Sequence, residues 1–209
     1  MKKETLQYWW TALYFPVYMF FFWLAESYTE NDFHVINIAL DDKIPFVEWF
    51  IFPYYLWFPF MALFFVLFFF RDKQEYIRMI ALLYAGMTLF LIISFVYPNG
   101  LELRPDEFPR DNAATRLVEL LYRSDTPTNV FPSIHVFNTL GMLIAVWRSD
   151  KVLQKRWMKW VTTGIGSLII CSTVFLKQHS VVDVIGAFVF AAILFLLVYR
   201  PRRGRKKAE

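Results

Sequence analysis

A histidine and an aspartate near the C-terminus have the spacing of a catalytic pair. His179 and Asp183 lie four residues apart at the start of an apolar run. On a helix, residues at this spacing share a face, so the carboxylate can hold one imidazole nitrogen. That bond fixes the tautomer and leaves the other nitrogen as a nucleophile or base. The pair therefore predicts a reactive histidine that is oriented by Asp183.

A second histidine ends the segment FPSIH at residues 131–135, which opens another apolar run. Proline followed by serine favours a helix start, because proline lacks the N–H that would be unsatisfied there. Free N–H groups and the helix dipole make such a start an anion site. His135 would then lie in the first turn, close to a bound anion, where it can protonate a leaving group.

Two cations accompany these histidines at the same predicted membrane level. Arg104 follows the third apolar run and Lys177 precedes the sixth. Their charges suit phosphoryl oxygens, and Ser133 adds a hydroxyl. A nucleophilic histidine, a second histidine as acid and cations around an anion site predict phosphoryl transfer that needs neither a metal nor another cofactor.

Other uses of these residues fit the pattern less well. A bis-histidine haem would not need the arginine and aspartate that accompany His135 and His179. A metal site needs more ligands of matching type, and the chain has three histidines. Ser133 lacks the G-x-S-x-G turn of many serine hydrolases. The third histidine, His34, has no such partners in sequence and is assigned to the membrane boundary.

The composition is that of a membrane protein. Of the 209 residues, 57% are hydrophobic, 21% aromatic and 19% charged, whereas soluble chains are about 45–50% apolar and about 25% charged. The lone cysteine, Cys171, excludes a disulfide-stapled module. Runs of roughly 20 apolar residues indicate spanning helices, and six runs predict an all-α polytopic fold. The six predicted spans are about 6–25, 49–70, 79–97, 133–147, 158–176 and 180–199.

The basic residues predict the orientation of these spans. With the N-terminus inside, the segments 1–5, 71–78, 148–159 and 200–209 are cytoplasmic and hold 16 of the 22 Lys and Arg residues. Both termini are therefore expected inside, with the basic tail facing anionic headgroups. The net charge of +4 implies no nucleic-acid partner. The candidate catalytic groups then lie on the extracytoplasmic side, and the cell membrane is the expected location.

Residues 1–209 are predicted to form a single integral membrane domain, in which 98–130 is a long extracytoplasmic loop. Loops of this length are usually functional or disordered. Helical spacing of apolar residues within it predicts a short amphipathic helix, either on the membrane surface or solvated. The apolar positions are Ala114, Leu117, Val118 and Leu121.

The order of these motifs resembles the type 2 phosphatidic acid phosphatase superfamily, membrane lipid phosphatases related to vanadium haloperoxidases. The family pattern is K-x6-RP, PSGH and SR-x5-H-x3-D. Arg104-Pro105 matches the first motif and residues 132–135 the second, with isoleucine in place of glycine. Ser172, His179 and Asp183 match the third motif.

Two cations of the family's phosphate cage are missing from their expected positions. Tyr97 stands where the family has lysine, and Thr173 stands where it has arginine. Lys177 lies one helical turn beyond Thr173. We hypothesise that Lys177 replaces the missing arginine.

The resemblance implies a six-helix fold and a lipid phosphate substrate, either a monoester or a pyrophosphate, drawn from the bilayer. It implies that His179 attacks phosphorus to form a phosphohistidine, that Asp183 orients it and that His135 protonates the leaving alkoxide. Arg104, Ser133 and Lys177 would hold the phosphoryl oxygens.

Two alternatives remain open at this point. The FPSxH form with Thr173 is also similar to the branch that contains inositolphosphoceramide and sphingomyelin synthases, which transfer a phospho-headgroup to an alcohol. The missing cations would also suit a degenerate, non-catalytic lipid-binding protein, whereas the intact His135, His179 and Asp183 oppose that interpretation.

Overall fold

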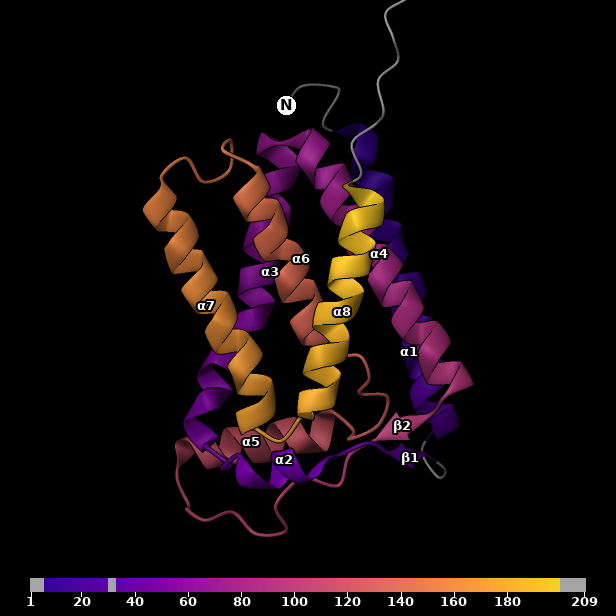
Figure 1. Cartoon of the computed structure of the whole chain (residues 1–209), viewed down its shortest axis with the longest axis vertical. Helices are drawn as coiled ribbons and strands as arrows, with labels where there is room; N and C mark the ends of the chain where they lie inside the picture. The colour runs from indigo at the N-terminus through magenta and orange to yellow at the C-terminus, as the bar shows by residue number, and fades with distance from the viewer. Residues whose placement is uncertain (1–5, 30–32, 200–209) are drawn as a thin grey trace, which may run out of the picture.

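The computed structural model describes residues 6–29 and 33–199, and its regular structure is almost entirely helical. The longer helices run side by side along one axis, and the short helices α2 and α5 gather with the strand pair at one end (Figure 1). The elements in chain order are η1 (Leu6–Leu13), α1 (Tyr14–Thr29), β1 (His34–Val35), α2 (Ala39–Lys43), η2 (Glu48–Phe50), α3 (Ile51–Arg71), α4 (Lys73–Val96), β2 (Asn99–Gly100), α5 (Ala113–Ser124), α6 (Ile134–Arg148), α7 (Arg156–Phe175) and α8 (Val181–Val198).

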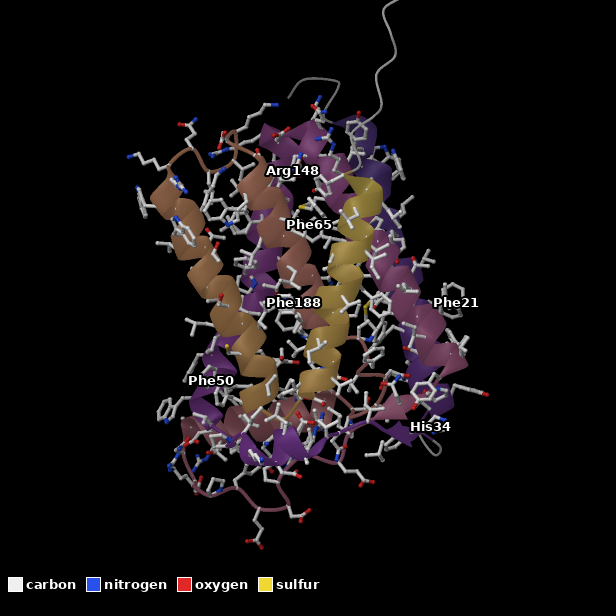
Figure 2. All side chains as sticks on the ribbon, in the orientation of Figure 1. Phe21, His34, Phe50, Phe65, Arg148 and Phe188 are labelled. Atoms are coloured by element: carbon white, nitrogen blue, oxygen red, sulfur yellow. The ribbon has the colours of Figure 1, made fainter. Side chains whose placement is uncertain are left out.

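Within residues 6–29 and 33–199, four helical segments are long and apolar enough to cross a membrane. They are Glu48–Arg71, Lys73–Val96, Arg156–Phe175 and Val181–Val198. Helix α6 is also apolar but shorter, with 15 residues. Exposed aromatic side chains such as Phe21 and Phe188 lie along the sides of the bundle, between His34 at one end and Arg148 at the other (Figure 2). The fold is all-α and compatible with an integral membrane protein, while six spans and their orientation stay predictions.

The first predicted span, 6–25, is not a single α-helix. It consists of the 3-10 helix η1, followed by α1 of 16 residues. Pro16 lies in the first turn of α1. Backbone N–H groups in a first turn have no acceptor within the helix, so a proline there costs no helical hydrogen bond. Proline therefore suits the start of an α-helix at this point better than the interior of a longer one.

Helix α4 begins at Lys73, six residues before the predicted boundary at 79. The Asp72 carboxylate caps it by accepting from the backbone N–H of Glu75 at 3.4 Å, and it also accepts from Ser149 Oγ at 2.8 Å. A side-chain cap can start a helix within a polar stretch, and a prediction based on hydropathy leaves such a stretch out of the apolar span. The helix and the apolar span therefore have different boundaries.

Within the 98–130 segment, residues Ala113–Ser124 form the helix α5. Asn112 caps it, because its side-chain oxygen accepts from the backbone N–H of Thr115 at 3.0 Å. The buried face of α5 packs against the start of α3 and against Leu176 in one apolar cluster. The apolar side of the helix is thus covered by protein at the end of the bundle. The cluster members are Ile51, Tyr54, Ala114, Val118, Leu121 and Leu176.

The main core forms where α6 packs against α4, α7 and α8. At the α4–α6 contact, a Cβ added to Gly86 would lie 2.0 Å from Cε1 of Phe137. Phe137 is itself 1% exposed, so its ring has little room to move. Glycine at this position therefore permits the close approach that holds the start of α6 beside α4.

We expect Gly86→Ala to destabilise the protein by about 1–3 kcal/mol, because overpacking displaces a buried ring. Gly164→Ala in α7 is the matched control, since an added Cβ there meets no atom within 4 Å. It should be neutral or stabilising by up to about 1 kcal/mol through helix propensity. Thermal unfolding in detergent measures both, and equal melting temperatures for the two variants would contradict this packing.

Candidate active site

His179 and Asp183 form a pair at the start of α8. Nδ1 of His179 lies 3.3 Å from Oδ2 of Asp183, and the same oxygen accepts from the backbone N–H of Ser180 at 2.8 Å. Both side chains are buried. A carboxylate accepts hydrogen bonds, so Nδ1 carries the imidazole proton and Nε2 presents its lone pair. The structure therefore places the Asp183 carboxylate against Nδ1 of His179, and the role of the pair stays a prediction.

The start of α6 lies directly beside that of α8. Ser133 caps α6, because its hydroxyl oxygen accepts from Val136 N–H at 3.3 Å, and its own N–H donates to the carbonyl of Asp183 at 3.3 Å. His135 follows in the first turn, and its ring centroid lies 6.0 Å from that of His179. Two imidazoles that are far apart in sequence thus meet across one small space.

Two aromatic rings of α3 flank His135. Its ring centroid lies 4.9 Å from Tyr54 and 4.6 Å from Trp57. These two rings pack against the imidazole and limit its rotation. Neither residue was predicted for the site. Tyr54 and Trp57 are three apart in an aromatic run and therefore share a helix face, but sequence alone does not distinguish them from aromatics that face lipid.

Arg104 approaches from the 98–130 loop. Its guanidinium donates to the carbonyls of Tyr122 at 3.1 Å and Asp125 at 2.7 Å, and to Oε1 of Gln178 at 2.9 Å. It also lies 4.4 Å from the centroid of the Tyr122 ring. Burial lowers the pKa of Arg104, against the opposing influence of Asp125, but a guanidinium keeps its charge. Arg104 is thus held next to His179 through Gln178.

The structure does not bring Lys177 to this space. Its ammonium donates to the carbonyls of Asp41 at 2.5 Å and Ile44 at 2.6 Å, at the C-terminal end of α2. Burial lowers the pKa of Lys177, while the neighbouring Asp41 and Asp42 oppose the change. Its backbone has a φ of 54°, in the left-handed region. The amine thus holds α2 in place, which differs from the predicted contact with phosphate.

The Asp41 side chain binds the residues that directly follow His179. Its two carboxylate oxygens accept from Ser180 Oγ at 2.6 Å and from the N–H of Val181 at 2.8 Å. Asp41 is 1% exposed, so these bonds operate without competition from water. Helix α2 therefore fixes the first residues of α8, next to His179.

A cavity of about 350 Å³ opens on the two histidines. His135, Gln178 and His179 line one side of it, and Asp125 lines it from the end of α5. The hydroxyl of Tyr54 donates to Oδ2 of Asp125 at 3.4 Å. Burial raises the pKa of the Asp125 carboxyl, although the nearby His179 and Arg104 oppose the rise. Asp125 was not predicted for the site, and its only sequence signal is an acidic residue directly after the amphipathic helix.

The third histidine lies apart from this cavity. The ring of His34 stacks on Tyr97, with centroids 4.5 Å apart, and β1 pairs with β2 in parallel. Tyr97 stands at the position where the family that this sequence resembles has lysine. Across residues 6–29 and 33–199, no group of three or more His, Cys, Asp or Glu side chains is placed to hold a metal ion.

Comparison with known families identifies the family of this chain. The model of the PAP2 superfamily matches residues 101–207, just over half of the chain. The chain belongs to the PAP2 superfamily. No curated protein and no solved structure matches it. The matched segment of this PAP2 protein contains every residue predicted for the site, from Arg104 to Asp183, while α1, α3 and α4 lie outside it.

The position of Lys177 in this PAP2 protein can be tested directly. We expect Lys177→Met to lower the free energy of unfolding by about 1–3 kcal/mol, because two backbone carbonyls lose their donor. Lys43→Met, at the exposed end of α2, removes a similar charge and should leave the melting temperature unchanged. An unchanged melting temperature in Lys177→Met, together with a large loss of phosphate release, would instead restore the phosphate-binding hypothesis.

Proposed function

We propose that this protein is an integral membrane lipid phosphate phosphatase that hydrolyses a phosphomonoester or pyrophosphate lipid through a phosphohistidine. Its membership in the PAP2 superfamily supports phosphatase-type activity on lipid phosphates in general. The assignment of residues rests on one observation: His179 is paired with Asp183 and faces His135 across 6.0 Å. Both rings also line the cavity of about 350 Å³, where a phosphoryl group would contact a nucleophile and an acid.

In the first step, Nε2 of His179 attacks phosphorus and the bond from phosphorus to the lipid oxygen breaks. His135 donates a proton to the departing alkoxide, which leaves as a neutral alcohol. Asp183 stabilises the positive charge that develops on His179, because its carboxylate contacts Nδ1. The flanking Tyr54 and Trp57 hold His135 in position for this transfer.

In the second step, water attacks the phosphohistidine from the side of His135. The neutral imidazole of His135 accepts a proton from that water, the bond between phosphorus and Nε2 breaks, and inorganic phosphate leaves. Both histidines return to their starting protonation states. The residues therefore complete a hydrolytic cycle with water as the acceptor.

The phosphoryl oxygens would be held by Arg104, Ser133 and uncharged donors. Among the described residues, Nε2 of Gln178 and Nε1 of Trp57 are buried without a hydrogen-bond partner, and both side chains line the cavity. The buried Nε of Arg104 likewise lacks a partner. The N–H groups of Gln178 and Trp57 would donate to a phosphoryl group in the cavity. Lys177 is left out of this set because its ammonium is bonded to α2.

The proposal places this site at the extracytoplasmic face of a six-span protein. The excess of Lys and Arg in the opposite connections supports the orientation. The FPSIH segment and Thr173 support placement in the branch that contains inositolphosphoceramide and sphingomyelin synthases.

We expect His179→Ala to lower phosphate release by at least about a thousandfold, because the nucleophile is lost. His135→Ala should lower it by about 10²–10⁴-fold, the usual contribution of a general acid. His34→Ala is the matched control, since His34 stacks on Tyr97 outside the cavity, and it should retain activity. The measurement is phosphate release from phosphatidate, phosphatidylglycerol phosphate and a polyprenyl pyrophosphate in detergent, without added metal.

Two results would contradict the proposal. Activity that survives in His179→Ala would exclude the phosphohistidine. No release by the wild-type protein from any of the three lipids would exclude the hydrolase, and added diacylglycerol, ceramide or inositol would then separate a transferase from a non-catalytic lipid-binding protein.

A further inference from the structure

Helix α2 binds the chain on both sides of His179. Before this residue, the ammonium of Lys177 donates to two backbone carbonyls at the C-terminal end of α2. After it, the Asp41 carboxylate accepts from the Ser180 hydroxyl at 2.6 Å and from the N–H of Val181 at 2.8 Å. The short stretch that carries the imidazole is therefore fixed at both of its ends by one helix.

The backbone turns sharply within this stretch. Lys177 has a φ of 54°, in the left-handed region that non-glycine residues seldom adopt unless the surrounding structure imposes it. The N–H groups of the next two residues, Gln178 and His179, both donate to the carbonyl of Thr173 at 3.0 Å. The side chains of these two residues line the cavity. The contacts with α2 therefore hold a turn that directs Gln178 and His179 to the site.

Ser180 connects the carboxylate of α2 with the candidate catalytic pair. Its hydroxyl donates to Oδ2 of Asp41, and its backbone N–H donates to Oδ2 of Asp183 at 2.8 Å. The same oxygen of Asp183 lies 3.3 Å from Nδ1 of His179. Hydrogen bonds from N–H to oxygen are usually about 2.7–3.2 Å long, so this contact is already at the long end of the range. A small displacement of Ser180 would therefore break it.

Asp41 is built as a rigid acceptor. Its side chain also accepts from the backbone N–H of Ile38 at 2.8 Å, and the residue is 1% exposed. The next residue, Asp42, is exposed on the same helix. Asp41 lies outside residues 101–207, which match the PAP2 superfamily. A segment beyond the matched part of the chain thus supplies a fixed support for the start of α8.

We propose that Asp41 is a positioning residue for phosphoryl transfer. Through Ser180 and Asp183, it keeps Nδ1 of His179 on the Asp183 carboxylate and Nε2 directed to the cavity. This inference rests on the proposed function and adds to it a residue of α2 that acts through others. Without the Asp41 carboxylate, we expect α8 to remain a helix while its first turn loses the fixed position of the imidazole.

Kinetics distinguish a positioning role from a structural one. We expect Asp41→Asn to lower kcat for phosphate release from phosphatidate by about 30–100-fold, because a misplacement of about 1 Å can cost about a hundredfold. KM should stay within about twofold, since the groups proposed to hold the phosphoryl oxygens are unchanged. Asp42→Asn is the matched control, because it removes the same charge from an exposed neighbour, and it should keep the wild-type kcat. Equal kcat in the two variants would overturn the inference.

A second variant shows whether Asp41 acts through Ser180. Ser180→Ala removes the hydroxyl but leaves the Asp41 charge in place, and we expect it to lower kcat by about tenfold or more. In the double variant the two losses should not multiply, because both changes break the same chain of contacts. Losses that multiply would overturn the inference. If Asp41→Asn does not fold, a wild-type kcat in Ser180→Ala would overturn it instead.

A spectroscopic measurement separates this inference from the proposed function. The full chain, labelled with ¹⁵N-histidine, is studied in detergent at about pH 8, where an ordinary imidazole is mostly neutral. Its three histidines give nitrogen signals that report which ring nitrogen carries the proton. The signal of His179 is the one that His179→Ala lacks. We expect the proton on Nδ1 in the wild type and in Asp42→Asn, and a mixture of both tautomers in Asp41→Asn.

The signal of His34, which lies outside the cavity, should be the same in all of these proteins. An unchanged His179 tautomer in Asp41→Asn would overturn the positioning role even if lipid phosphate is hydrolysed. A changed tautomer in a protein that hydrolyses none of the lipids would contradict only the hydrolase.

Discussion

The site depends on the meeting of two helix starts. Asp183 joins them, because its carbonyl accepts from Ser133 N–H at the start of α6 while its carboxylate contacts His179 and Ser180 at the start of α8. The capping bonds that begin each helix therefore also set the separation of the two imidazoles. Loss of this junction would leave both helices intact but would no longer fix His135 opposite His179.

Buried carboxylates in the same end of the molecule serve as fixed acceptors. Asp41 holds Ser180 and Val181, and Glu48 accepts from Arg110 at 3.0 Å, which ties the segment before α5 to the start of α3. Buried charge is costly unless it has partners. Asp41 accepts hydrogen bonds from α8, and Glu48 is paired with Arg110. The segments outside the long helices are thus bonded to the helix ends that carry the site.

Much of this arrangement could be predicted from the sequence, because it follows local rules. The four-residue spacing of His179 and Asp183, the serine cap before His135 and the apolar face of α5 are all patterns along one helix. The other features depend on tertiary contacts. Lys177 looks like a phosphate ligand by spacing, yet its ammonium contacts the carbonyls of Asp41 and Ile44, more than 130 residues away in sequence. Tyr54, Trp57 and Asp125 join the cavity only because α3 and α5 pack over it.

The central claim is that His179 carries the phosphoryl group during turnover. The most direct measurement is rapid quenching of the protein with a lipid phosphate labelled with ³²P, followed by mapping of the labelled peptide. The account predicts an acid-labile, base-stable label on His179 that is present in His34→Ala and absent from His179→Ala. A label on another residue, or no label on the protein while phosphate is being released, would contradict it.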